Sequence, residues 1–107
     1  MPFLTIHKLT GNADELLGRK QARFDPTTAR LAPAHGALFS VTARSAEGLV
    51  VVNLWDSAEA AAGFTQLPEV QQASRDAELP MPSSFERYEG ATLDIYRPLE
   101  PTTSRST

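Results

Sequence analysis

A mostly apolar run that leads straight into a helix start constrains this chain most: residues 49–59 read LVVVNLWDSAE. A short aliphatic and β-branched run is typical of a buried strand. An acid followed three residues later by glutamate is typical of a helix N-terminus, so we predict that Asp56 and Glu59 form a capping box. Asn53 and Trp55 are two residues apart and share one strand face. Buried polar groups need partners, so that face is either a satisfied core or a pocket lining.

The composition excludes several classes of protein. The chain has 107 residues, enough for one domain with a single modest core. Its formal net charge is −3 and its basic residues form no stripe, so we expect no nucleic-acid partner. No apolar run approaches the roughly 18 residues of a membrane span, and residues 1–10 lack a signal-peptide pattern, so we expect no membrane association. The absence of cysteine excludes disulfides and thiolate metal sites and fits a cytoplasmic protein.

Periodicity and turn residues predict four strands and two helical regions. Strand-like patterns are found in residues 3–9, 37–44, 49–55 and 91–97. Residues 45–48 read SAEG, and Gly48 suits a hairpin turn. The first helical region contains Pro26, which either kinks the helix or starts a second one. The helical regions are residues 13–31, then 57–66 and 69–78 with Pro68 between the last two.

The resulting order, β-α-β-β-α-β, predicts an α+β fold of the ferredoxin-like type. In this sandwich four antiparallel strands form a sheet, and two kinked helices cover one of its faces. The predicted strands are apolar on both faces, so we expect a second copy to cover the other face in a homodimer. We place this domain at residues 1–97 and a flexible tail, rich in proline and hydroxyl side chains, at 98–107.

The segment VVVNLWDSAEAAAGF, residues 50–64, resembles the dimeric α+β barrel superfamily and, within it, the antibiotic-biosynthesis-monooxygenase-like domains. The resemblance spans residues 3–97 and is strongest at this junction between a strand and a helix. It implies the ferredoxin-like fold and pairing of two subunits into a barrel. Members of this group carry out several chemistries, so the resemblance supports the fold better than a reaction.

Haem-degrading members of the group use an asparagine on the first strand, a tryptophan on the second helix and a histidine later on that helix. This chain has His7, Phe64 and Ser74 at the corresponding positions. All three differ, so we reject haem degradation.

Other members oxidise polyketide anthrones without metal or flavin. They use an asparagine and a tryptophan on the third strand, a tyrosine on the second helix and an arginine further along it. Here Trp55 matches, Asn53 is displaced by two residues, and Arg75 falls within one residue of the arginine. Ala61 stands where the tyrosine is expected, which is a departure from the proton-handling half of that mechanism.

Three side chains are candidates for catalysis. His7 is the one group on the first strand that titrates near neutral pH, so it is a candidate general base; the alternative is a hydrogen-bonded strand histidine. Asn53 and Arg75 are candidates to hold an enolate oxygen. The alternatives are a satisfied core amide for Asn53 and a solvated helix face for Arg75. His35, next to Gly36, is expected in a surface loop, and we predict no metal site and no cofactor.

Four aromatic side chains are candidates for substrate binding. Trp55 would stack on a planar substrate, and Phe24 and Phe64 would form apolar walls. Tyr88 would close the mouth of the pocket, unless its charged neighbours place it in a solvated segment. The sequence therefore predicts a homodimeric, cofactor-independent oxygenase or related enzyme acting on an aromatic or polyketide-like small molecule. The alternative is a non-catalytic small-molecule-binding or stress-related dimeric barrel.

Overall fold

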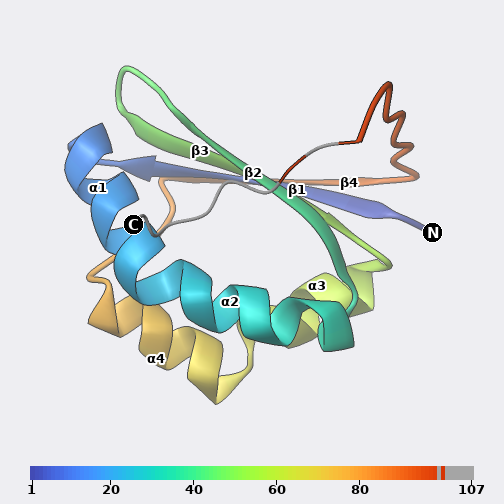
Figure 1. Ribbon diagram of the computed structural model, residues 1–107, viewed down its shortest axis with the longest axis horizontal. Helices are drawn as coiled ribbons and strands as arrows, with labels where there is room; N and C mark the ends of the chain where they lie inside the picture. The colour runs from blue at the N-terminus through green and yellow to red at the C-terminus, as the bar shows by residue number, and fades with distance from the viewer. Residues whose placement is uncertain (99, 101–107) are drawn as a thin grey trace.

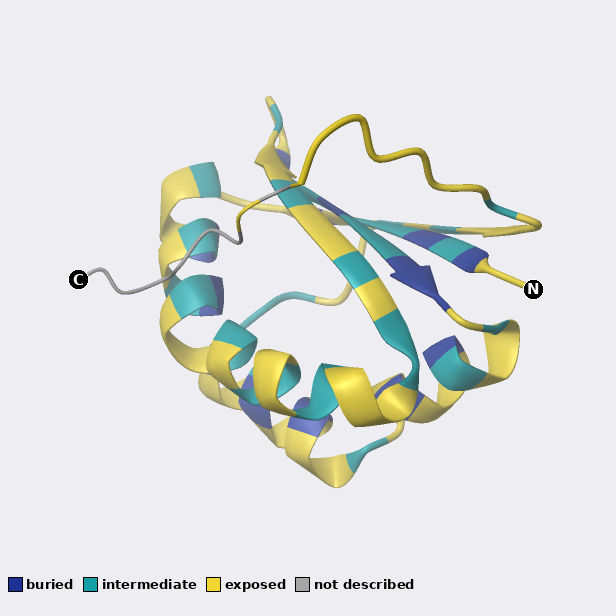
Figure 2. Cartoon of the chain, turned by 45° about the vertical axis from the view of Figure 1, so that its right-hand side comes forward, coloured by how far each residue is buried: buried dark blue, intermediate teal, exposed yellow. Residues whose placement is uncertain are grey.

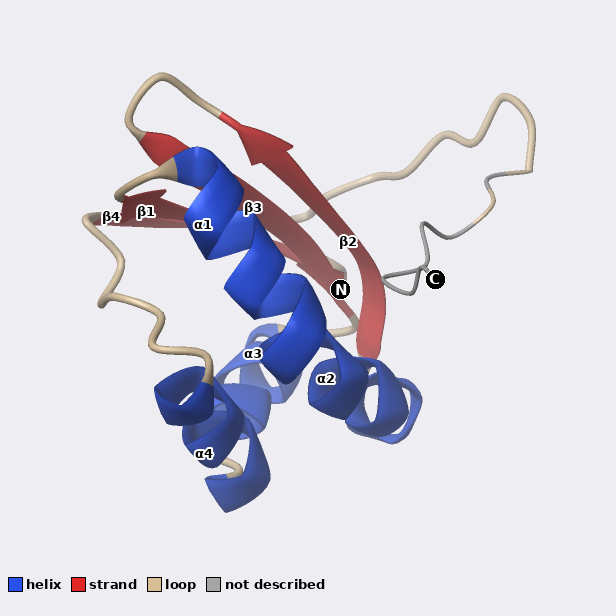
Figure 3. Ribbon diagram, turned by 60° about the vertical axis from the view of Figure 1, so that its left-hand side comes forward, coloured by secondary structure: helices blue, strands red, loops and turns tan. Residues whose placement is uncertain are grey.

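The computed structural model, which describes residues 1–98 and 100, has one four-stranded antiparallel sheet. The strand order is β2-β3-β1-β4, and helices cover one face (Figures 1 and 3). This arrangement confirms the ferredoxin-like prediction. The strands are β1 (Phe3–Thr10), β2 (Ala37–Arg44), β3 (Gly48–Trp55) and β4 (Ser84–Glu89).

The predicted hairpin joins β2 to β3. The Ser45 amide donates to the Gly48 carbonyl at 2.9 Å, and the Gly48 amide donates to the Ser45 carbonyl at 3.3 Å. A Cβ atom on Gly48 would lie 2.0 Å from the Leu9 carbonyl oxygen of the neighbouring strand. Only glycine permits this approach, so this residue fixes how closely the hairpin packs on β1.

The first helical region is divided by a π-helical turn. It comprises α1 (Ala13–Arg19), the π-turn η1 (Lys20–Phe24), α2 (Asp25–Leu31) and the 3₁₀ turn η2 (Ala32–His35). Pro26 has no amide hydrogen for an α-helical bond, and its ring would clash with the carbonyl four residues earlier. The chain widens instead, and the Asp25 amide donates to the Lys20 carbonyl five residues back. The proline thus produces the predicted two-part helix.

The second helical region consists of α3 (Ala58–Thr65) and α4 (Pro68–Asp76). The N-cap of α3 is Ser57, whose side chain accepts from the Ala60 amide, so the predicted capping box on Asp56 and Glu59 is wrong. The Asp56 amide donates to the Gly36 carbonyl at 2.8 Å, which holds Asp56 at the strand end and starts the helix one residue later. No helix in the described part of the chain is long and apolar enough to cross a bilayer.

The last strand lies earlier than predicted. Residues 84–89 pair with β1, whereas residues 91–97, where we expected the strand, pair with no strand. The Gly90 and Ala91 amides both donate to the Pro2 carbonyl, at 3.0 and 3.2 Å, and the chain then leaves the sheet. It runs back on the side away from the helices (Figure 2). The predicted tail, residues 98–107, lies outside the described residues except for 98 and 100.

The two faces of the sheet are covered differently. The inner face, under the helices, carries a core cluster of Phe3, Trp55, Ala61, Phe64 and Val70 and a second cluster of Leu9, Leu16 and Leu49. The outer face also carries apolar side chains, and no helix covers it (Figure 3). Its members are Leu4, Ile6, Phe39, Val41, Val50, Val52 and Leu54. Most are half-buried by their neighbours, and Val41 is 45% exposed.

Candidate functional site

A small cleft opens on the inner face, between the β1–β4 edge of the sheet and helix α3. Its volume is about 50 Å³. Small side chains at helical spacing on α3 keep this space open. The α3 contribution is Ala58, Ala61, Ala62 and Thr65. The strands contribute Phe3, Thr5, His7, Trp55, Phe85 and Arg87.

His7 lies on the wall of this cleft, on the helix-facing side of β1. It is half-buried, and burial lowers the pKa of its imidazole below the ordinary value of 6.5. Its ring packs at a tilt against Phe85, with 4.6 Å between ring centroids. A lowered pKa keeps the imidazole neutral at neutral pH, so it is able to accept a proton.

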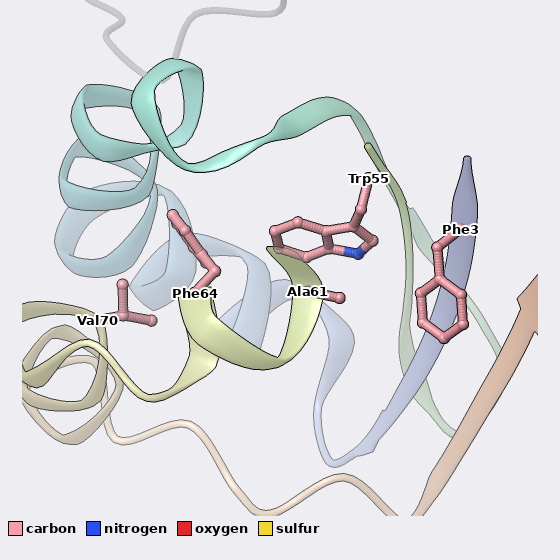
Figure 4. Packing of buried hydrophobic residues seen from close by; sticks show 5 residues of the cluster. All are labelled: Phe3, Trp55, Ala61, Phe64 and Val70. Carbon is pink, nitrogen blue, oxygen red and sulfur yellow. The ribbon is translucent and has the colours of Figure 1, made fainter. Parts of the chain in front are cut away.

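Trp55 is 4% exposed and lines the cleft. Figure 4 shows its indole ring between Phe3 and Phe64. Its indole nitrogen donates to the Thr5 hydroxyl oxygen at 3.0 Å, which satisfies the one polar group of the ring. Phe64 packs against the other end of the ring system, at 5.3 Å between centroids. This hydrogen bond and this contact hold the indole plane in one orientation.

Arg87 completes the cleft on the edge strand. Its backbone is paired with Thr5, and its guanidinium carbon lies 5.9 Å from the centroid of the Phe85 ring. Because Phe85 in turn packs on His7, the three side chains form a continuous row along the cleft wall. Within residues 1–98 and 100, Arg87 makes no ion pair.

The opposite side of the inner face, near β2, holds a buried cation with different surroundings. Lys20 of η1 is 6% exposed. Its ammonium group donates to Asp25 Oδ1 at 2.8 Å and to Thr42 Oγ1 at 3.1 Å, and it lies 5.9 Å from the Phe24 ring centroid. These contacts satisfy the charge from within the fold and link the π-turn to β2.

The structure brings some of the candidate site residues together. His7 and Trp55 line the same cleft, and Phe64 packs on Trp55. Phe24 packs against the same core cluster without lining the cleft. Asn53 is half-buried on the inner face, between Thr5 and Ser40 in the strand register, and is not a cleft residue.

Two other candidates lie elsewhere. Arg75 is exposed on α4, and its Nη2 atom donates to Gln72 Oε1 at 2.9 Å. Tyr88 is 52% exposed on the outer face of β4. Its hydroxyl donates to Glu86 Oε1 at 3.1 Å, and this bond to an anion raises the pKa of the phenol above its ordinary value of 10.0.

Sequence reasoning missed Phe85 and Arg87 because it placed the last strand too late. The segment SFERYE does alternate, and on a strand Phe85 and Arg87 share one face. Its charged residues favoured a solvated segment, but an edge strand tolerates charges. Within the described residues, no group of three His, Asp or Glu side chains is placed to hold a metal ion; the expectation of no metal stays a prediction.

Comparisons with known proteins give fold-level likeness alone. No family model matches the sequence, and no curated protein matches it. A solved structure from Chloroflexus aurantiacus J-10-fl, named as a candidate antibiotic biosynthesis monooxygenase, is 19% identical with a TM-score of 0.65, covering 89% of this chain and 98% of its own.

Two further solved structures are similar. SnoaB, a cofactor-independent oxygenase from Streptomyces nogalater, is 16% identical with a TM-score of 0.61, covering 90% of this chain and 96% of its own. A dimeric ferredoxin-like protein of unknown function from Jannaschia sp. CCS1 is 11% identical with a TM-score of 0.59, covering 83% of this chain and 98% of its own. The chain therefore has the ferredoxin-like fold of antibiotic-biosynthesis-monooxygenase-like proteins.

Proposed function

We propose that this protein is a cofactor-independent oxygenase that acts on an aromatic or polyketide-like small molecule in the cleft. The observation that carries the proposal is His7, a half-buried imidazole with a lowered pKa on the wall of a cleft with aromatic walls. Structural likeness to SnoaB, a cofactor-independent oxygenase, adds support. The walls suit a flat ring, because Phe3, Trp55 and Phe85 present aromatic surfaces to it.

The reaction requires a substrate that supplies its own electrons. In a conjugated R₂CH₂ compound, His7 removes one proton and leaves a delocalised carbanion. The carbanion donates electrons to dioxygen, a C–O bond forms, and loss of water completes R₂CH₂ + O₂ → R₂C=O + H₂O. The carbon loses four electrons and dioxygen gains four, so no other reductant is consumed.

The size of the cleft limits how the substrate binds. A volume of 50 Å³ has room for roughly four water-sized groups. The reacting edge of one ring fits there, next to His7, while the rest of the molecule lies over Phe85 and Arg87 at the mouth. A substrate held in this way exposes its acidic carbon to the imidazole and most of its body to solvent.

The test is oxygen uptake with a panel of anthrones and hydroxylated aromatic ketones, with the protein-free rate subtracted. We expect His7→Ala to lower the catalysed rate by about 10²–10⁴-fold, the usual contribution of a positioned general base. The matched control is His35→Ala, which removes an exposed histidine outside the cleft. If both variants keep the wild-type rate, His7 is not the base. If the wild-type protein gives no uptake above background on the panel, the oxygenase proposal fails.

A second candidate, a non-catalytic binding protein, is favoured by one observation. No described residue donates to or accepts from the His7 ring, so no acid orients the imidazole as catalytic histidines are often oriented. In that case, aromatic ligands would change Trp55 fluorescence without oxygen uptake. His7→Ala would then leave the affinity unchanged to within about 2-fold.

We also propose that the protein is a homodimer joined through the outer faces of its sheets. The outer face is apolar and uncovered by helices, and such surfaces on soluble proteins usually mark an interface. The Jannaschia protein of the same fold is described as dimeric. A C₂ pairing of one face with itself would cover both copies at once.

Light scattering tests the dimer directly. At micromolar concentration we expect about twice the chain mass of 11.6 kDa. Val41→Glu places a charge on the outer face and should give a monomer. Ala29→Glu, an exposed position on α2, is the matched control and should remain dimeric. A wild-type monomer, or a Val41→Glu variant that remains dimeric, would contradict pairing through this face.

A further inference from the structure

We propose that Arg87 is the specificity residue of the cleft and that the ligand is an aromatic carboxylate. The inference rests on the proposed function in one respect, since it concerns the same cleft. It adds a substrate class, and it gives Arg87 the anion-binding role that sequence reasoning assigned to Asn53 and Arg75.

The charges of the cleft favour an anion. Arg87 is the one permanently charged side chain among the cleft residues, and no Asp or Glu lines the cleft. The lack of acidic side chains in the cleft contrasts with the whole chain, which has 13 acidic and 10 basic residues. Glu89, two residues on, shares the face of Arg87 but is exposed opposite Phe3 and makes no ion pair with it.

Arg87 also differs from most of the other arginines in the described residues. Five of them already donate to acceptors within the chain: Arg19, Arg23, Arg30, Arg44 and Arg75. Arg87 has no such acceptor in the described residues, although it faces a cleft. A guanidinium with free donors presents the planar fork that binds a carboxylate through two parallel hydrogen bonds.

The row of side chains fixes where that carboxylate would sit. The guanidinium lies over Phe85, and Phe85 packs on His7, at centroid distances of 5.9 and 4.6 Å. A carboxylate on Arg87 therefore places the attached ring over Phe85, with its far edge toward His7. The same contact with Phe85 limits the motion of the arginine, so less freedom is lost when the ligand binds.

The experiment compares two probes of the same shape, 2-naphthoate and 2-naphthamide, by isothermal titration calorimetry. Arg87 is exposed, and ion pairs on exposed side chains are worth up to about 1 kcal/mol because water screens them, so we expect the wild-type protein to prefer the acid by up to roughly 5-fold. Arg87→Gln should reduce this preference to about 1-fold and leave the affinity for the amide unchanged. High salt should weaken only the binding of the acid.

The matched control is Arg97→Gln, which removes an exposed arginine outside the cleft and should keep the preference. The inference about Arg87 fails, and the proposed function stands, in two cases. Either both probes bind equally well to the wild-type protein, or Arg97→Gln abolishes the preference as Arg87→Gln does. If neither probe binds, the cleft does not take aromatic ligands, and the proposed function fails as well. Circular dichroism of each variant checks that the fold is intact.

Discussion

Both sides of the inner face of the sheet carry basic side chains next to an aromatic ring, but they differ in whether those basic groups have polar partners. Near β2, the buried Lys20 has a carboxylate, a hydroxyl and an aromatic ring as partners, all within the chain. Near β4, His7 and Arg87 pack on the Phe85 ring, and neither has a polar partner in the described residues. A satisfied buried charge connects elements of the fold, whereas unpaired polar groups on a cleft remain available to a ligand.

We propose that polar residues with partners inside the chain have a structural role in this fold, and that those without partners on the cleft bind a ligand. Burial alone does not separate them, since Lys20 is more buried than His7. Hydrogen-bond partners do separate them, because every fully buried side-chain nitrogen or oxygen in the described residues has such a partner. We therefore expect substitutions near β2 to change stability and substitutions near β4 to change binding and turnover.

The largest effect on stability is expected from Trp55→Ala, which lies between the two sides. It removes a buried aromatic ring and should cost about 3–5 kcal/mol in the free energy of unfolding, measured by urea denaturation. Thr5→Val removes only the acceptor of the indole and should cost about 1–2 kcal/mol. Equal costs for the two variants would show that the hydrogen bond, not the packing, holds the ring.

Lys20→Ala should cost about 1–3 kcal/mol, because it leaves Asp25 and Thr42 without their shared donor. The pair is partly open to water on the Asp25 side, which keeps the cost below that of a fully buried pair. Ligand affinity in the cleft should not change. If Lys20→Ala abolishes binding at unchanged stability, the contrast between the two sides is wrong.

His7 should make stability depend on pH. Its pKa in the folded state is below the ordinary 6.5, so between the two values the unfolded chain binds more protons. Stability should therefore fall as the pH drops below about 6.5, by at most about 1.4 kcal/mol per pH unit from this group. His7→Gln should remove this component of the pH profile of urea unfolding, and His35→Gln should retain it. An unchanged profile in His7→Gln would show that other groups produce it.

The smallest effect is expected from Arg44→Ala. Arg44 pairs with Asp14 at 2.8 Å, but both side chains are largely exposed. Such pairs are worth about 0–1 kcal/mol because water screens them. Thermal unfolding should detect almost no shift, and a cost equal to that of Lys20→Ala would show that burial does not set the strength of the pairs near β2.

Most of the fold could be predicted from the sequence because the signals are local. Alternation predicted β1 and β2, the apolar run predicted β3, Gly48 predicted the hairpin, and Pro26 predicted the division of the first helical region. The cap of α3 was misplaced because its position depends on the bond from Asp56 to Gly36, which lies 20 residues earlier in the sequence. Such a contact is not visible in local spacing.

The candidate site could be predicted only in part, because its residues come together only when the correct segment pairs with β1 as the edge strand. His7 was chosen because it is the one group on the first strand that titrates near neutral pH, and Trp55 because of its strand face and the family resemblance. Phe85 and Arg87 come into register with His7 and Thr5 only when residues 84–89 form the edge strand. Residues 91–97 alternate just as well, and the charged residues of 84–89 favoured them over the segment that forms the strand.

The π-turn of η1 depends on the exact number of residues in the first helical region. A π-turn is equivalent to one residue inserted into an α-helix. Deleting a residue from Lys20–Phe24 would restore an α-helical repeat, in which Asp25 stays one turn after Lys20 and the later residues keep their faces. The clash of Pro26 with the carbonyl one turn earlier would then return. When this chain is aligned with others of its fold, a one-residue gap at this turn therefore has a structural meaning that a gap in a surface loop lacks.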